Sequence, residues 1–334
     1  MLALSRASGG NQAVQDAVRR IVVVGGGTAG WITASLIAAE NRDSAHAPEV
    51  VLVESPDIPI IGVGEGTWPS MRLTLQKIGL AEADLVRQCE ASFKQGTRFT
   101  GWATRGDDSQ YVHPFSLPAE YATLNLAEHW LATEVASSFA EFVTPQAKII
   151  AAGLAPKQSV TPEYAFNVNY GYHFDAGKFA RLLHHHAVAR LGVQHVSGNV
   201  ERVESEADGS IAAVVLATGQ RLAGDLFVDC TGQRALLIGR QPGAGFVSVK
   251  EILFNDTAIA VQVPYADAGQ PIASVTCATA VSSGWIWDIG LQTRRGVGHV
   301  YSSTYTSDAE ALSTLRDYIG RVSPRTDLDQ LGFR

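Results

Sequence analysis

The stretch Ile-Val-Val-Val-Gly-Gly-Gly-Thr-Ala-Gly, residues 21–30, decides the fold of this chain. Four β-branched residues run straight into Gly25, Gly27 and Gly30, and a helix-compatible segment over 31–40 follows. This pattern predicts a buried strand, a tight turn and a helix start. In such a turn the first glycine allows the bend and the second lets a pyrophosphate approach the backbone. The third glycine lets the helix pack close to the strand.

The residues around this turn strengthen the dinucleotide interpretation. Residues 49–54 have the pattern of a second parallel strand, and Glu54 closes it where a ribose hydroxyl needs an acceptor. The phosphates would bind the free N–H groups at the positive end of the helix, those of Thr28 and Ala29. The motif alone leaves open whether the dinucleotide is FAD or NAD(P).

The composition is that of a globular protein, with 46% hydrophobic and 18% charged residues. A net charge of −7 provides no electrostatic footprint for nucleic acid or an anionic membrane. Three cysteines without a CxxC pair predict reduced thiols and a cytoplasmic protein. Residues 1–20 lack an apolar signal-peptide centre, and we expect them to form a flexible leader.

The loop over 55–69 is unusual because it holds three glycines and three prolines around the apolar pair Ile60-Ile61. Directly after a nucleotide-binding strand, a loop with so little side chain in its middle can lie against a flat cofactor ring. The alternative is an ordinary surface connection rich in glycine and proline. The central apolar pair favours the functional interpretation.

The middle of the chain is predicted to be mainly helical. Helices are expected over 70–78, 82–92, much of 120–160, and 176–191. Residues 93–102 are interpreted as a helix end that turns into a strand, and 111–115 as a turn-rich loop. His184, His185 and His186 occupy successive helical positions about 100° apart, so they cannot chelate one metal together. No metal site is predicted.

Later segments favour FAD over a plain NAD domain, because regular βαβ alternation gives way to antiparallel strands. Strands are predicted at 200–205 and 211–216 around an Asp208-Gly209 hairpin turn, and again through 258–303. The strand that ends in Asp229-x-x-Gly232 can return to the first nucleotide. We therefore predict an α/β protein with a Rossmann-like FAD-binding fold of the flavin monooxygenase type. An added antiparallel sheet and helices form its substrate region.

These pieces, in this order, resemble the flavin-dependent tryptophan halogenases. The resemblance rests on four elements and covers residues 21 to about 330. They are the glycine turn, the Ile61-Gly62-Val63-Gly64-Glu65 loop with Pro69, the Phe93-Lys94-x-Gly96 turn before Trp102, and Trp285-x-Trp287-x-Ile289. Two departures are Gly290, where the family has proline, and Trp68, where a smaller residue is common.

The resemblance implies a function and a set of roles. Reduced FAD (FADH2) would react with oxygen to form a C4a-hydroperoxide, and chloride or bromide would attack it to form hypohalous acid. Lys94 matches the lysine that receives this acid beside the substrate, where its amine can polarise it or form a haloamine. The remaining roles fall on the following residues: Gly62, Val63, Gly64 and Glu65 in the strap between flavin and substrate; Asp229 and Gly232 in the FAD site; His113, Phe115, Trp285 and Trp287 around the substrate.

The resemblance also sets expectations for the whole chain. We expect 21–334 to be one domain in which FAD-binding segments (about 21–70 and 176–240) interleave with substrate-side segments (about 71–175 and 241–334). The family's catalytic glutamate and halide loop would lie beyond Arg334, so we expect these residues alone not to halogenate. A separate flavin reductase, a tryptophan-like or other indole substrate and a homodimer are the expected partners.

Two alternatives remain open. The first is an FAD-dependent aromatic hydroxylase, which shares the flavin hydroperoxide but has no need of Lys94. The second is a non-catalytic truncated module that binds flavin without turnover. A Lys94→Ala variant separates the first from a halogenase, and the visible spectrum of the purified chain tests the second.

Overall fold

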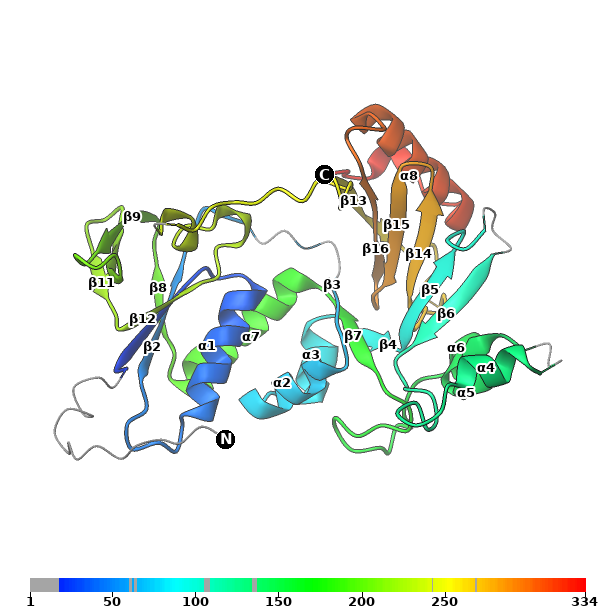
Figure 1. Cartoon of the computed structure of the whole chain (residues 1–334), viewed down its shortest axis with the longest axis horizontal. Helices are drawn as coiled ribbons and strands as arrows, with labels where there is room; N and C mark the ends of the chain where they lie inside the picture. Colours follow the sequence, from blue (N-terminus) through cyan, green and yellow to red (C-terminus); the bar gives the residue numbers. More distant parts are fainter. Residues whose placement is uncertain are drawn as a thin grey trace. The chain divides into compact units, whose positions relative to one another are not determined.

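The computed structural model describes residues 18–59, 62, 65–104, 109–133, 137–241, 243–267 and 269–334. The predicted strap residues Val63 and Gly64, and most of the leader, lie outside these ranges. The chain divides into two compact units (Figure 1). The first comprises residues up to Pro59 together with Leu183–Phe246, and the second comprises Ile60–Leu182 together with Val247–Arg334.

The first unit contains the predicted Rossmann-like sheet. Its four parallel strands run in the order β12, β1, β2, β8. Their bounds are Arg20–Val24 (β1), Glu49–Glu54 (β2), Gln194–Ser197 (β8) and Leu226–Asp229 (β12). Helix α1 (Thr28–Glu40) connects β1 to β2, so the strand, turn and helix predicted from the glycine motif are confirmed.

A three-stranded antiparallel meander belongs to the same unit. It consists of β9 (Val200–Ser205), β10 (Ile211–Leu216) and β11 (Arg221–Ala223), in the order β11, β10, β9. Gly209 has a φ of +90° in the turn between the first two strands, as the Asp-Gly signal predicts. Val214 and Leu216 pack with Val22, Val24 and Val53 into one apolar core. This core fixes the end of β1 from which the glycine turn begins.

The second unit is built around a six-stranded sheet in the order β13, β16, β15, β14, β5, β6. The bounds are Gly96–Thr100 (β5), Gln110–Pro114 (β6), Thr257–Pro264 (β13), Thr276–Val281 (β14), Gly284–Gly290 (β15) and Arg294–Tyr301 (β16). Helix α8 (Asp308–Val322) covers one face, where Leu315 and Ile319 pack on Val261, Ile286 and Val297 (Figure 1). The predicted Ser307/Glu310 capping box starts this helix.

A small antiparallel sheet and several helices complete the second unit. The sheet joins β3 (Glu65–Gly66), β7 (Gly171–Phe174) and β4 (Ser92–Lys94). The helices are α2 (Ser70–Ile78), α3 (Glu82–Gln88), α4 (Leu126–Leu131), α5 (Phe139–Val143), α6 (Gln146–Ala151) and α7 (Ala176–Leu191). The boundary between the two units falls within α7.

Three local predictions between residues 88 and 115 were wrong. Helix α3 ends at Gln88, whereas the predicted helix continued to residue 92. Phe93 and Lys94 lie in β4, paired with Tyr172 and Gly171, rather than at a helix end. Residues 110–114 form β6 on the edge of the large sheet, where a loop was expected. In each case pairing with a distant strand overrides a local sequence pattern.

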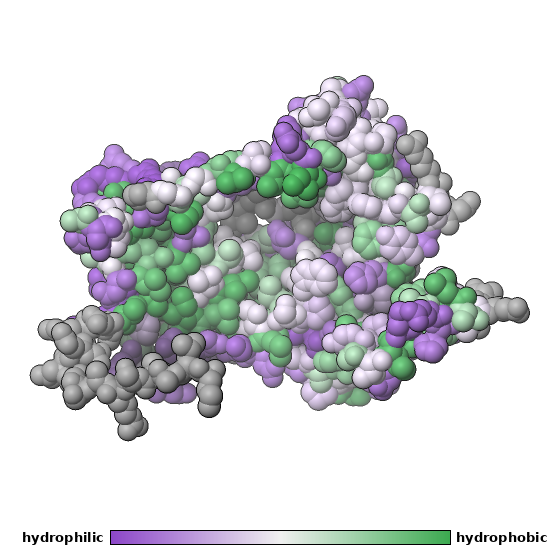
Figure 2. Space-filling model, viewed as in Figure 1, coloured by the Kyte–Doolittle hydropathy of each residue, from purple (hydrophilic) through white to green (hydrophobic). Residues whose placement is uncertain are grey.

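Exposed apolar side chains gather between the last turn of the first unit and β13. Phe246, Val247, Ile252 and Leu253 are each at least two-thirds exposed, and Figure 2 shows hydrophobic colour along this segment. They therefore contribute little to either hydrophobic core. Among the residues that the structure describes, no helix is long and apolar enough to cross a bilayer.

Candidate functional site

The turn between β1 and α1 requires glycine at two positions for steric reasons. Gly25 has a φ of +117°, and a Cβ there would lie 2.2 Å from the carbonyl oxygen of Cys230. A Cβ on Gly30 would lie 1.8 Å from the carbonyl oxygen of Gly25. A Cβ on Gly27, in contrast, would meet nothing within 4 Å. The turn is therefore packed against β12 on one side and open at Gly27.

The open side of this turn lies at the start of α1. Gly27 is the N-cap and provides no side-chain hydrogen bond, and the first turn carries no acidic residue. The first N–H groups of the helix, including those of Thr28 and Ala29, have no intrahelical acceptor. With the positive end of the helix dipole, they form an anion-binding position. These features fit the pyrophosphate of a dinucleotide such as FAD.

Glu54 lies directly over the glycine turn. A Cβ on Gly26 would be 2.2 Å from Cδ of Glu54, so only glycine allows this carboxylate to lie there. One carboxylate oxygen of Glu54 is 3.1 Å from Nε2 of His195 on the neighbouring strand β8. The acid predicted for the ribose is thus beside the turn, and it has a histidine neighbour that the sequence did not reveal.

Asp229 organises the loop after β12. Its two oxygens accept hydrogen bonds from the N–H and hydroxyl of Thr231 and from the N–H groups of Leu237 and Ile238. Burial would raise the pKa of Asp229, but these donors outweigh burial and hold the pKa below its usual range. Gly232 begins a 3₁₀ turn (Gly232–Arg234) with a φ of +62°. The carboxylate therefore shapes the loop, and its oxygens already have donors.

In the second unit, Lys94 is a half-buried lysine without a counter-ion. Among the described residues its Nζ makes no hydrogen bond or ion pair, and this atom lies 5.6 Å from the ring centroid of Phe115. Burial lowers the pKa of Lys94. A Cβ on Gly66 would lie 3.1 Å from Nζ and 3.4 Å from Oγ1 of Thr276. The amine therefore lies against the bare backbone of β3, and it is available to a ligand.

His173 is buried on the strand between Gly66 and Lys94 in the small sheet. It pairs with Gly66 in register, and its Nε2 is 2.9 Å from the hydroxyl of Thr276. Burial, and then the positive charge of Lys94, lower the pKa of His173 to about 3. The imidazole is therefore neutral at physiological pH and adds no second positive charge beside the lysine.

The two residues predicted to sandwich the substrate differ in their surroundings. Phe115 is half-buried, with Lys94 on its ring and the indole of Trp68 5.4 Å away. His113 is exposed on β6, opposite Thr97, and has no ring contact with Phe115 among the described residues. The structure thus brings Phe115 to Lys94 but does not join His113 to them. Trp68, 65% exposed, provides the additional aromatic surface.

The two tryptophans of β15 lie on the face of the large sheet opposite α8. Trp287 is in register with Ala278 and Gly298, and a Cβ on Gly298 would come within 2.1 Å of its indole. Trp285 contacts Trp287 and also Trp102, with both pairs of ring centroids 6.3 Å apart. Thr276 lies two residues before Ala278 on the same face. This aromatic face therefore extends along β14 toward the hydroxyl that borders Lys94.

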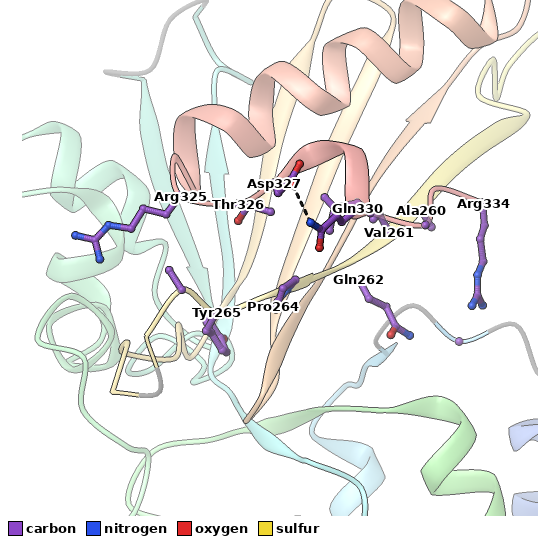
Figure 3. Close-up of a pocket in the computed structure, with 14 residues that line it drawn as sticks. Ala260, Val261, Gln262, Pro264, Tyr265, Arg325, Thr326, Asp327, Gln330 and Arg334 are labelled. Atoms are coloured by element: carbon purple, nitrogen blue, oxygen red, sulfur yellow. Dashed lines mark hydrogen bonds between the residues drawn. The ribbon is translucent and has the colours of Figure 1, made fainter.

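Gly62, the one strap glycine described before β3, lines a pocket of about 480 Å³ (Figure 3). The pocket lies between β13 and the segment after α8, where the amide of Gln330 donates to Asp327. Gly62 also packs on the start of α7, since a Cβ there would lie 2.9 Å from that of Ala176. Glu65 is exposed in β3. Lys94 and Phe115 do not line this pocket.

Sequence reasoning missed several neighbours of the predicted residues. They are Gly26 and His195 beside Glu54, and Gly66, His173 and Thr276 around Lys94. Gly66 belongs to the glycine-rich loop already singled out, so its spacing could have indicated a role. The histidines and Thr276 carried no local signal, because only strand pairing brings them to the site.

Several known proteins are similar to this chain in sequence and in structure. The tryptophan halogenase family matches residues 20–334. The tryptophan 7-halogenase RebH of Lentzea aerocolonigenes is 33% identical over 334 residues, which is 95% of this chain and 62% of that protein. The tryptophan 6-halogenase SttH of Streptomyces toxytricini is 34% identical, over 94% of this chain and 63% of that protein. The crystal structure of tryptophan halogenase from Shewanella frigidimarina NCIMB 400 matches with a TM-score of 0.88 at 47% identity, over 96% of this chain and 62% of that chain.

The parallel sheet, the glycine turn and the added antiparallel sheet define a Rossmann-like FAD-binding fold of the kind found in flavin-dependent halogenases. The chain belongs to the tryptophan halogenase family. It spans less than two thirds of the length of the relatives it matches, 62% in the case of RebH.

Proposed function

We propose that the protein is an FADH2-dependent halogenase that acts on tryptophan or another electron-rich aromatic compound. In this reaction an aromatic C–H, a halide ion, a proton, O2 and FADH2 give the aryl halide, FAD and two molecules of water. Chloride and bromide are both candidate halides. When bound, the reduced flavin would activate O2, which is the oxidant of the halide.

The observation that carries this proposal is the environment of Lys94. Its ammonium is half-buried, has no counter-ion among the described residues and lies on the ring of Phe115. A cation in this setting can hydrogen-bond hypohalous acid and polarise it toward an aromatic ring. A hydroxylase needs no such group. The halogenase is therefore favoured over the aromatic monooxygenase.

The chain's other residues take roles that support this chemistry. We assign the pyrophosphate of FAD to Gly25, Gly27, Thr28, Ala29 and Gly30 and its ribose to Glu54. Asp229 and Gly232 shape the loop beside them. In the second unit, Gly62, Val63, Gly64 and Glu65 form the strap. Phe115, His113, Trp285 and Trp287 surround the substrate, with Phe115 supported by its contact with Lys94.

The partners follow from this assignment. We propose that a separate flavin reductase supplies FADH2 and that the aromatic substrate is tryptophan or an indole. We assign FAD binding to the segments at about 21–70 and 176–240. Substrate binding is assigned to the segments at about 71–175 and 241–334. A cytoplasmic location is supported by three cysteines that form no disulfide.

The decisive experiment uses the protein encoded by the whole reading frame of the gene. It is incubated with a flavin reductase, FAD, O2, chloride and tryptophan, and the products are analysed by mass spectrometry. We expect a product in which chlorine replaces hydrogen, and no such product from Lys94→Ala. The control Lys148→Ala removes an exposed lysine from α6 and should retain activity.

Other outcomes would contradict the proposal in distinct ways. An oxygenated product that persists in Lys94→Ala would identify a hydroxylase. A flavin spectrum without any turnover, across a panel of indoles and both halides, would identify a non-catalytic flavin-binding module.

A further inference from the structure

Three potential metal ligands converge on one face of the parallel sheet in the first unit. Glu54 closes β2, and His195 lies in β8, in register with Leu52. Side chains two residues apart on a strand share a face, so Glu54 and His195 lie on the same side. His184 comes from α7. One ligand atom from each of Glu54, His184 and His195 lies within 4.8 Å of the other two.

A buried indole orients the two imidazoles. Trp31 of α1 is 1% exposed, and its ring stacks on His184 with centroids 4.6 Å apart and planes 19° apart. The same indole is 5.4 Å from His195, and the two imidazoles are 4.5 Å apart in an edge-on arrangement. A rigid aromatic wall of this kind reduces the rotamer freedom that a metal would otherwise have to remove.

The polar atoms of this cluster are not satisfied by one another. Nε2 of His195 is buried and has no hydrogen-bond partner among the residues that the structure describes, although Oε2 of Glu54 is only 3.1 Å away. His184 lies beside this unpaired nitrogen, with its ring centroid 4.5 Å from that of His195. Two imidazoles and a carboxylate are ligands typical of zinc.

We propose that Glu54, His184 and His195 form a binding site for one divalent transition-metal ion of the Zn²⁺ or Co²⁺ class. Metal bonds of about 2.0–2.1 Å in a tetrahedral site separate ligand atoms by about 3.4 Å, so small side-chain rotations close the present arrangement. Three protein ligands leave the fourth position open to water. His185 and His186, at the neighbouring helix positions, are not part of the cluster.

The test is a titration of the metal-free chain, without an affinity tag, with Co²⁺. Tetrahedral Co²⁺ has intense visible absorption bands, which report the coordination directly. We expect saturation at one Co²⁺ per chain, and at least a tenfold loss of affinity in His195→Ala and in His184→Ala. The control His185→Ala removes an exposed imidazole from the same helix and should bind like the wild type.

Three results would overturn the site: absence of saturable binding, unchanged affinity in both His184→Ala and His195→Ala, or octahedral spectra without imidazole ligation. Circular dichroism of each variant checks that the sheet is intact. If His195→Ala unfolds, His195→Gln keeps a polar side chain of similar size and should still lose the Co²⁺ bands.

One consequence rests on the proposed function, because Glu54 is also the assigned acceptor for the ribose of FAD. We expect saturating Zn²⁺ to weaken FAD binding several-fold in the wild type and to have no effect in His195→Ala. Flavin fluorescence measures this independently of the Co²⁺ bands. If Co²⁺ binds stoichiometrically but FAD affinity is unchanged, the metal site stands and the role of Glu54 at the ribose is wrong.

Discussion

The half-buried ammonium of Lys94 lowers the stability of the fold, because burial removes its hydration and no counter-ion among the described residues replaces it. We expect Lys94→Met, which keeps most of the aliphatic stem on Phe115, to stabilise the chain by up to about 1 kcal/mol. In the protein encoded by the whole reading frame, the same substitution should abolish halogenation. Urea denaturation measures the first effect and product analysis the second. A destabilised Lys94→Met would show that the amine is structurally required rather than held for a ligand.

His173 gives stability a defined pH dependence. Its pKa is about 3 in the fold, against 6.5 for an unperturbed histidine. Between these values the unfolded chain binds a proton that the folded chain does not, so stability falls as pH falls. The slope from this one group is about 1.4 kcal/mol per pH unit.

The matching variant is His173→Gln, which cannot titrate in this range. We expect it to be less stable than the wild type at pH 7, because the contact with Thr276 changes. Its stability should nevertheless depend less steeply on pH between about 5.5 and 4. Chemical denaturation at several pH values compares the two. Parallel profiles for both proteins would contradict the depressed pKa.

At the scale of single residues, the sequence pointed to individual candidate side chains but not to the neighbours that surround them in the fold. Lys94 and Glu54 belong to recognisable motifs, so the sequence alone was enough to propose them as site residues. Their neighbours His173 and His195 were not, because isolated histidines carry no pattern. Three successive histidines could be excluded as one chelating set, yet His184 meets His195 through the pairing of β8 with β2.

The turn between β1 and α1 permits a test that separates folding from ligand binding. Gly25→Ala would place a methyl group 2.2 Å from the carbonyl oxygen of Cys230 at a φ of +117°, and we expect a loss of at least about 2 kcal/mol. Gly27→Ala meets no atom within 4 Å, so its stability should change by less than about 1 kcal/mol. Thermal unfolding without ligand measures both.

The Gly27→Ala variant, which should remain folded, is expected to lose affinity for FAD. The methyl group of Gly27→Ala would occupy the space through which a pyrophosphate approaches the helix start, so FAD affinity should fall at least tenfold. Flavin fluorescence titration of the folded variant measures this. Normal affinity in Gly27→Ala would mean that the dinucleotide does not bind at this turn.

Elements with strong local signals were predicted, whereas elements that depend on long-range pairing were missed. The strand before Gly25, the helix after Asp175 and the capping box at Ser307 each have a short-range cause. Strand β4 has none, because Phe93 and Lys94 become extended only by pairing with β7. Strand β6 contains a proline, which is tolerated because the strand lies at the edge of its sheet.

At the scale of the whole chain, ligand-induced stabilisation can identify the dinucleotide that the glycine motif left open. A ligand that binds only the folded state at 100 times its dissociation constant stabilises it by about 2.7 kcal/mol. We expect FAD, but not NADH or NADPH at the same concentration, to raise the melting temperature of this chain. Glu54→Gln should show a smaller shift. An increase with NADPH alone would contradict the flavin assignment.

The order of elements along the whole chain was also partly predictable. The switch from alternating strand and helix to antiparallel strands marked the departure from a plain Rossmann domain. The division into two units could be placed only in part from composition: one boundary follows Pro59 in the loop rich in glycine and proline, but another lies inside α7, where no linker-like segment marks it. Apolar residues on both sides of that boundary continue one helical pattern.

The contact between Trp287 and Gly298 has a consequence for how such proteins diverge. Any side chain at position 298 would displace the indole opposite it, so the two positions must be inherited together. A homologue that gains even alanine there must tilt or replace its tryptophan, which would reshape the aromatic face beside Trp285. Laboratory evolution aimed at bulkier substrates could therefore begin from a single backbone position on β16 and leave the aromatic residues themselves unchanged.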